Sequence, residues 1–167
     1  MRYYPIFLDI RGRRAVVVGG GKVAERKVRK LLRAGAEVRV ISPQLTPRLG
    51  QWVVEKKISV TRRPYRRADI SHGARGDMPL LVFAATNDPA VQLAVCEDAR
   101  AAGALVNVAS DAAQCDFIVP ASLARGNLHL AISTSGTDPS LARWLRQRLA
   151  TATRKSTGRR KKSKVKT

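Results

Sequence analysis

Three consecutive glycines, Gly19 to Gly21, follow a run of small and β-branched apolar residues and precede a helical pattern. In this arrangement Gly19 permits a tight turn, Gly21 lets phosphate groups approach the main chain, and Ala24 allows the helix to pack closely on its strand. Free amide groups and the helix dipole favour negative charge at the start of such a helix. The motif therefore predicts binding of a dinucleotide, the alternative being a purely structural turn.

The residues at the end of the second predicted strand contain no acidic side chain that could hold a ribose. Such an acid is typical of NAD sites, whereas a nearby arginine accommodates the 2′-phosphate of NADP. Arg39 is either such a phosphate contact or simply a solvated strand residue. We take Ser42, Pro43 and Gln44 as the alternative ribose contacts. The preference between NAD and NADP stays open on these residues alone.

Two further strand ends carry polar side chains that could face the same crevice, since ligands of open α/β sheets lie beyond the carboxyl ends of the strands. Thr86 and Asn87 follow one strand and can form hydrogen bonds with a cofactor, while Asp88 is expected to cap the next helix. Asp111 follows another strand. It could accept a proton or stay ionised beside a cationic ring, and the alternative is an ordinary turn aspartate.

A cluster of hydroxyl residues and a glycine precedes the last predicted helix: Ser133, Thr134, Ser135 and Gly136. Hydroxyl groups and free amides at a helix start can form an anion nest, and they can equally serve as a simple cap. His72 and His129 stand alone, and no cysteine or histidine cluster has the spacing of metal ligands. No metal site is predicted.

These residues are positioned by alternating strand and helix patterns. Strands are predicted at 15–18, 38–41, 58–61, 80–85 and 105–108, and helical patterns follow the first, second and fourth of them. This alternation predicts a Rossmann-like α/β fold, a parallel sheet with helices on both faces. A short N-terminal strand is also expected over Ile6–Ile10.

The pattern changes after Val108. Two strands are expected at 117–119 and 128–133, joined by a turn at 125–127, and a last helix begins at Asp138. This small α+β unit must pack on the first part or pair with a second copy, which predicts a homodimer. We divide the chain into a nucleotide-binding domain (1–112), a dimerisation and substrate region (113–153) and a basic tail (154–167) that we expect to be disordered.

The composition is strongly basic: 167 residues include 32 Lys or Arg and 12 Asp or Glu, a net charge of +20. The tail holds eight of the basic residues and no acid, so the remainder still carries +12. Such a charge attracts polyanions: nucleic acid, an anionic membrane surface or a small polyanionic substrate.

No apolar run is long enough for a membrane span, and the N-terminus does not have the pattern of a signal peptide. Two separated cysteines favour a reducing, cytoplasmic setting.

Six segments, in order, resemble the precorrin-2 dehydrogenase family of sirohaem synthesis, including the N-terminal module of bacterial sirohaem synthase. They are Tyr4-Pro5-Ile6-Phe7-Leu8, Val18 to Lys27, Ala84 to Asp88, Cys115 to Ala121, Ala131 to Gly136 and Leu141-Ala142-Arg143. The resemblance covers about residues 3 to 150. Their combination is far more specific than the glycine motif alone.

The resemblance implies NAD-dependent oxidation of precorrin-2 to sirohydrochlorin by a homodimer, with ferrous iron insertion in some members. It places cofactor contacts on Lys22, Val23, Pro43 and Gln44. The eight carboxylates of the substrate would give the basic body of the protein a purpose, and we assign carboxylate binding to the cluster at 133–136.

One departure concerns the candidate catalytic residues. Family members that both oxidise and chelate carry an aspartate at the fourth position of the segment that begins here at Asn107, and this chain has Ser110 there, with Asp111 one place later. A serine is not an anionic base near neutral pH. Either Asp111 takes over with a shifted turn, or chelation is weak or absent; we expect a dehydrogenase with little ferrochelatase activity.

A hypothesis from a different class is a dinucleotide-sensing regulatory module whose basic tail touches nucleic acid. The tail contains no aromatic residues on which bases could stack. Only non-specific attraction to phosphates is therefore predicted for it.

Overall fold

The computed structural model describes residues 3–67, 69–70 and 78–162, with side chains up to residue 153. It consists of two compact units, one formed by residues 5–118 and one by residue 119 onward together with the N-terminal residues up to Tyr4. None of the helices in the described part of the chain is both long and apolar enough to cross a membrane.

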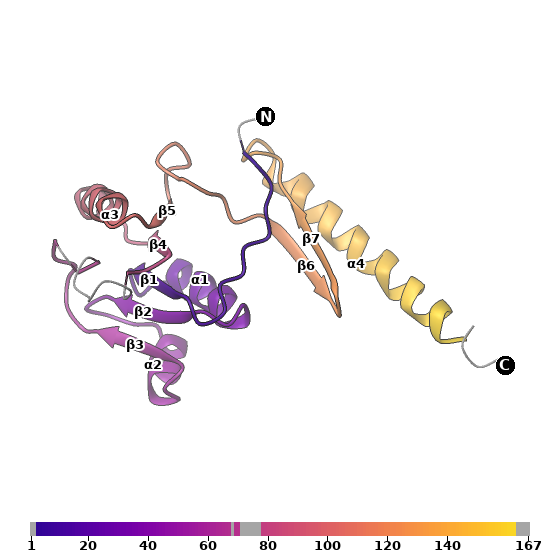
Figure 1. The fold of residues 1–167 in the computed structure, drawn as a ribbon, viewed down its shortest axis with the longest axis horizontal. Coiled ribbons are helices and arrows are strands. Elements are labelled where there is room, and N and C mark those ends of the chain that lie inside the picture. Colours follow the sequence, from indigo (N-terminus) through magenta and orange to yellow (C-terminus); the bar gives the residue numbers. More distant parts are fainter. Residues whose placement is uncertain (1–2, 68, 71–77, 163–167) are drawn as a thin grey trace. The chain divides into compact units, whose positions relative to one another are not determined.

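The larger unit is built on a five-stranded parallel sheet with the strand order β3-β2-β1-β4-β5 (Figure 1). The strands are β1 (Arg14–Val18), β2 (Glu37–Ile41), β3 (Ile58–Thr61), β4 (Leu81–Ala84) and β5 (Leu105–Val108). The chain moves outward from β1 to β3 and then returns to place β4 on the other side of β1. Ligands of such sheets bind where the strand order reverses, which here lies between β1 and β4.

Helices cover both faces of this sheet, as the sequence pattern predicted. Helices α1 (Lys22–Arg33) and α2 (Pro47–Val54) pack on one face, where Val28 and Trp52 join a core with Val17 and Val40. Helix α3 (Pro89–Ala101) packs on the other face. Because alternate residues of a strand point to opposite faces, the apolar run of β1 serves both cores. The Rossmann-like fold class is confirmed.

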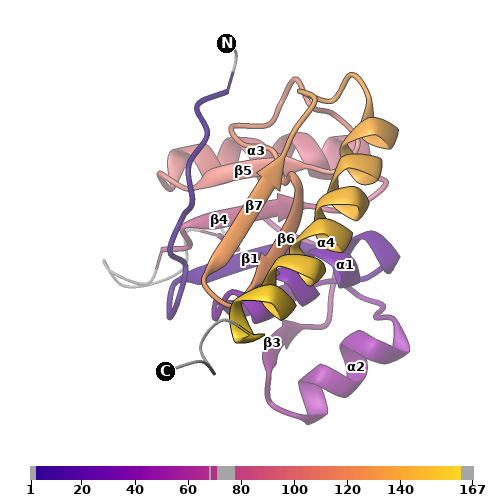
Figure 2. The same cartoon turned by 90° about the vertical axis from the view of Figure 1, so that its right-hand side faces the viewer.

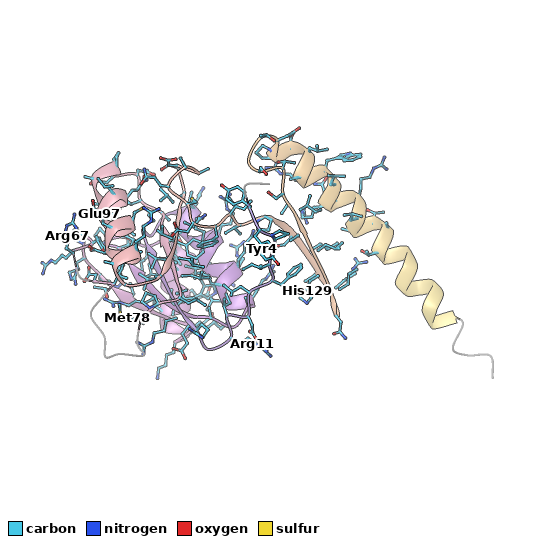
Figure 3. All side chains as sticks on the ribbon, turned by 45° about the horizontal axis from the view of Figure 1, so that its top comes forward. Tyr4, Arg11, Arg67, Met78, Glu97 and His129 are labelled. Carbon is cyan, nitrogen blue, oxygen red and sulfur yellow. The ribbon has the colours of Figure 1, made fainter. Side chains whose placement is uncertain are left out.

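The segment after β3 is fastened to α3 by polar contacts rather than by a helix of its own. The hydroxyl group of Tyr65 donates to Asp98 at 2.5 Å, and Arg67 forms an ion pair with Glu97 at 2.5 Å (Figure 3). Asp69 is almost buried and forms an ion pair with Arg63 at 2.6 Å. These contacts hold the described part of the β3–β4 connection against the unit.

The smaller unit contains an antiparallel hairpin, β6 (Ala121–Arg125) and β7 (Leu128–Ile132), and one helix, α4 (Pro139–Lys162). Helix α4 runs alongside the hairpin (Figure 2). The turn at Gly126 has a positive φ of 53°, which agrees with the predicted turn at 125–127.

Three predicted boundaries differ from the structure. The strand expected at Phe117–Val119 is wrong: β6 begins at Ala121, after Pro120, which has no amide hydrogen for a sheet ladder. The strand expected at Ile6–Ile10 is absent from the described residues, because the segment has no partner strand, and most of it is exposed. Helix α4 continues through 154–162, beyond the expected end of the helix, and residues 163–167 lie outside the described residues.

Candidate functional site

The turn between β1 and α1 is made of glycines, and two of them are required by space. Gly19 has a φ of +120°, and a Cβ atom there would lie 2.3 Å from the carbonyl oxygen of Ala85. A Cβ atom on Gly20 would lie 1.8 Å from the carbonyl oxygen of Gln44. Both neighbours are backbone atoms that cannot rotate away. The turn is therefore held tightly between the end of β4 and the loop after β2.

Gly21 differs from the other two glycines because the space beside it is open. Its φ of −82° and ψ of −173° suit any residue, and a Cβ atom would meet nothing within 4 Å. Gly21 is the N-cap of α1, and among the described residues no side chain forms a capping hydrogen bond with this helix. By contrast, the side chains of Thr46 and Asp88 cap α2 and α3. Uncapped amides beside an open space are what a phosphate group requires.

The first turn of α1 continues this surface. Lys22 and Val23, the cofactor contacts that the resemblance implies, are both exposed, while Ala24 is fully buried against the sheet. The predicted role of Ala24 in close helix–strand packing is confirmed. Lys22 adds a positive charge at the same helix end.

The loop after β2 is fixed to the glycine turn. The amide of Thr46 donates to the carbonyl oxygen of Gly20 at 3.0 Å, and its hydroxyl group donates to Glu25 at 2.9 Å. Ser42 is buried and donates to the carbonyl oxygen of Gln44 at 2.7 Å, so its hydroxyl group shapes the loop. Pro43 and Gln44 are exposed beside the turn. Of the predicted ribose contacts, these two are the accessible ones.

Arg39 does not lie free at the strand end. Its guanidinium group donates to the hydroxyl oxygen of Thr61 at 3.2 Å and to the carbonyl oxygen of Asp69 at 3.3 Å. It points to the same face of β2 as Ile41. The side chain therefore joins β2 to β3 and to the segment after it, and the hypothesis that it holds a 2′-phosphate has no support in this geometry.

The end of β4 lies directly against the glycine turn. The amide of Ala85 donates to the carbonyl oxygen of Val18 at 2.7 Å, and Gly19 approaches both Ala85 and Thr86. Asp88 accepts hydrogen bonds from the amides of Ala90 and Val91 at 2.9 and 3.2 Å, which confirms its predicted capping role. Thr86 is half-buried and Asn87 is exposed. Both side chains are accessible to a ligand at the point where the strand order reverses.

A buried side chain that the sequence analysis did not single out joins the ends of β4 and β5. Gln92 on α3 is only 7% exposed. Its Nε2 donates to the carbonyl oxygen of Thr86 at 2.5 Å, and its Oε1 accepts from the hydroxyl group of Ser110 at 2.8 Å. The sequence signal was a polar residue among the inward-facing positions of a helix, four residues after the cap.

Asp111 has the geometry of a turn aspartate. It accepts hydrogen bonds from the amide side chain of Gln114 at 2.9 Å and from the amide of Ala113 at 2.8 Å. These bonds, the one from Gln114 first, lower the pKa of its carboxyl group below the ordinary value. Asp111 is therefore ionised at neutral pH, which makes it a fixed negative charge and a weak base.

A second polar contact that sequence reasoning missed joins α1 to β5. The ammonium group of Lys27 donates to the side-chain oxygen of the buried Asn107 at 2.5 Å and lies 4.9 Å from the ring centre of Phe83. Asn107 in turn donates to the carbonyl oxygen of Phe117 at 2.9 Å. Burial lowers the pKa of Lys27 to about 8. This contact holds the strand that precedes Ser110 and Asp111.

The hydroxyl cluster of the smaller unit forms a compact turn before α4. The amide of Ser135 donates to Ser133 Oγ at 3.0 Å, and the hydroxyl group of Thr134 donates to the carbonyl oxygen of Asp138 at 2.8 Å. Ser135 and Gly136 have φ values of 55° and 87°. Asp138 accepts from the amide of Leu141 at 2.8 Å and so caps the helix. Capping is thus present, and anion binding stays a prediction.

The structure describes one of the two histidines. His129 lies exposed on β7 (Figure 3), and His72 lies outside the described residues. Within the part of the chain that the structure describes, no three His, Cys, Asp or Glu side chains could hold a metal ion together.

Comparison with known proteins agrees with this geometry. An NAD(P)-binding family model matches residues 6–121. The chain is 43% identical over 159 residues to a siroheme synthase of Nitrosococcus oceani, covering 95% of this chain and 33% of that protein, and 42% identical over 151 residues to that of Methylobacillus flagellatus, covering 90% and 31%. It spans about a third of the length of these curated relatives. Among solved structures it is similar to SirC, a precorrin-2 dehydrogenase, with a TM-score of 0.74 and 30% identity over 90% of this chain and 71% of that one.

Proposed function

Because this chain belongs to the NAD(P)-binding family and to the family of precorrin-2 dehydrogenase, we propose that it oxidises precorrin-2 to sirohydrochlorin, with NAD⁺ as the cofactor. The observation that carries this proposal is the uncapped start of α1 beside the open space at Gly21. A purely structural turn would need neither feature. At the starts of α2 and α3, by contrast, the side chains of Thr46 and Asp88 accept hydrogen bonds from the free helix amides.

The residues present fit a dinucleotide. The amides of Gly21, Lys22 and Val23 would hold the diphosphate, and Pro43 and Gln44 would lie beside the ribose of the adenosine half. Thr86 and Asn87 follow β4, on the other side of the glycine turn from Pro43 and Gln44, where the nicotinamide half would bind. Bound NAD⁺ supplies a hydride acceptor. What the protein supplies is mainly position, since proximity and orientation contribute several kcal/mol to such reactions.

The reaction removes a hydride from a bridge carbon of the substrate, and a proton leaves afterwards. We assign Asp111 the role of a fixed anion near the strand ends, because its lowered pKa makes it a poor proton acceptor. Ser110 offers a hydroxyl group at the same place. The proton then leaves to water. Without a carboxylate at position 110, we propose that iron insertion is weak or absent.

The substrate carries many carboxylates, and two features of the chain suit it. The net charge of +20 attracts polyanions. In the smaller unit, Ser133 to Gly136 form a turn with hydroxyl groups and two residues of positive φ, a conformation that exposes backbone amides. We propose that this turn binds substrate carboxylates.

We further propose that the protein is a homodimer through its smaller unit. Within the described residues no third strand pairs with the hairpin, and this unit exposes Leu128, Leu141 and Trp144. A second copy would cover these groups.

Cytoplasmic location is proposed on the two free thiols of Cys96 and Cys115. For nucleic acid we propose only non-specific, salt-sensitive contact through the basic tail.

The experiment is direct. Purified protein, NAD⁺ and precorrin-2 are expected to yield sirohydrochlorin and NADH in equal amounts, followed by absorption. Size-exclusion chromatography with light scattering tests the dimer. Protein that binds NADH yet forms no sirohydrochlorin would reject the proposed reaction while leaving the dinucleotide site in place.

A further inference from the structure

The contacts of Gln92 fix which way its side-chain amide faces. The carbonyl oxygen of Thr86 can only accept a hydrogen bond, so the atom of Gln92 that lies 2.5 Å from it must be the NH₂ group. The amide oxygen then faces Ser110 at 2.8 Å. Since an amide oxygen can only accept, the hydroxyl group of Ser110 must be the donor.

This orientation decides what Ser110 offers to its surroundings. Its hydroxyl hydrogen is directed toward Gln92, so the remaining lone pairs of the oxygen are directed elsewhere. Gln92 is 7% exposed, whereas Ser110 is an exposed residue. Ser110 therefore presents a hydrogen-bond acceptor, and not a donor, at the carboxyl end of β5.

Gln92 also controls the neighbouring strand end. Thr86 is held twice: its carbonyl oxygen by Gln92, and its hydroxyl oxygen by the amide of Asp88 at 3.3 Å. One buried amide thus sets the positions of Thr86 and Ser110 relative to each other. These are the ends of β4 and β5 on the side where the nicotinamide half of the cofactor would lie.

We propose that Gln92 is a positioning residue of the hydride-transfer site, which orients Ser110 so that its oxygen accepts a hydrogen bond from an N–H group of a bound reactant. This inference rests on the proposed function. Two reactants carry such groups, the carboxamide of the nicotinamide ring and the nitrogen atoms of the macrocycle. Their shared chemistry is an N–H donor, and the experiment separates them.

The test compares Ser110→Ala, Ser110→Thr and Gln92→Leu with the parent. NADH binding is measured by its fluorescence in the absence of substrate, and KM for precorrin-2 and kcat are measured by NADH formation. Losing one neutral hydrogen bond is expected to weaken the affected binding step about three- to tenfold. Ser110→Thr keeps the hydroxyl group and is expected to retain the parent's affinity. The double variant Ser110→Ala/Gln92→Leu is expected to lose little more than either single variant, because both act through one contact.

Matched controls remove the same chemical groups elsewhere. Gln51→Leu on α2 and Ser59→Ala on β3 change exposed residues that have no part in the site, and both are expected to bind NADH as the parent does. Ser110 is exposed, so its alanine variant keeps the fold even where the buried change at Gln92 lowers the melting temperature.

The outcomes separate cleanly. A weaker affinity for NADH in Ser110→Ala identifies the carboxamide as the donor, and an unchanged affinity with a raised KM for precorrin-2 identifies the macrocycle. If Ser110→Ala changes neither quantity, or if the losses in the double variant simply add, the inference is overturned. If the parent binds NADH but does not oxidise precorrin-2, only the proposed reaction is rejected. The inference is then decided by comparing the NADH affinity of Ser110→Ala with that of the parent.

Discussion

Replacing Gly21 with aspartate is expected to move stability and cofactor binding in opposite directions. The backbone at Gly21 suits any residue, and the space beside it is open, so the new side chain causes no clash. It supplies the N-cap that α1 lacks and places a negative charge at the positive end of the helix. The same carboxylate occupies the place where the diphosphate of the cofactor would lie.

Both magnitudes follow from this geometry. An aspartate cap adds a few tenths of a kcal/mol over glycine, and its interaction with the helix dipole adds a similar amount, so about 0.5 to 1 kcal/mol is gained. That raises the melting temperature by roughly 1 to 4 °C. Two like charges about 4 Å apart repel by about 4 kcal/mol near a protein surface, and screening by solvent reduces this to about 2 to 4 kcal/mol for a diphosphate. The affinity for NADH is therefore expected to fall about 30- to 1,000-fold.

The assay combines thermal unfolding followed by circular dichroism with titration of NADH fluorescence. Gly21→Ser separates the two effects, because it caps the helix without adding charge and is expected to lose much less affinity. Gly50→Ala in α2 is the control for stability alone: a Cβ atom there meets nothing within 4 Å, and alanine favours a helix over glycine by about 0.5 to 1 kcal/mol.

The reasoning is refuted if Gly21→Asp melts higher than the parent and still binds NADH with the parent's affinity. In that case the diphosphate does not lie on the first turn of α1. A lower melting temperature would contradict the open space beside Gly21 and the absence of a cap.

Three further predictions concern other residues of the larger unit. Gly19→Ala is expected to cost at least about 2 kcal/mol of unfolding free energy in urea titrations, because the positive φ and the Ala85 carbonyl group leave no place for a side chain; an unchanged titration would contradict it. Burial lowers the pKa of Lys27 from 10.5 to about 8, so between these pH values the unfolded chain binds more protons than the folded chain. The free energy of unfolding therefore rises with pH across that window, by on the order of 2 kcal/mol. Urea titrations at several pH values are expected to show this rise in the parent and not in Lys27→Met. Iron insertion into sirohydrochlorin, followed by absorption, is expected to be low in the parent and higher in Ser110→Asp, because a carboxylate can act as a base near neutral pH; equal rates would contradict this expectation.

Much of the fold was readable from local patterns. The predicted strands at 15–18, 38–41, 58–61 and 105–108 fall within or match β1, β2, β3 and β5, because buried parallel strands are continuous apolar runs. The cap at Asp88 was predictable because the cap and the amides it binds are neighbours in the chain. The error at Phe117–Val119 has the opposite origin. The segment forms no regular strand. The ring of Phe117 packs edge-on against Phe83, with the ring centres 5.5 Å apart, and strand pairing starts at Ala121, after Pro120.

In the candidate site, too, some features were predictable from the sequence and others were visible only in the folded structure. The sequence by itself determined the glycine turn, the family motifs and the strand ends that carry polar residues, because these depend on residue type and short spacing. Only the tertiary structure decided that Gly19 and Gly20 are needed for space while Gly21 is open, that Arg39 is engaged with β3, and that Gln92 orients Ser110. The contact between Lys27 and Asn107 joins residues 80 positions apart. Periodicity reports which face of an element is buried, but it carries no information about which distant side chain will lie within hydrogen-bond distance once the sheet has formed.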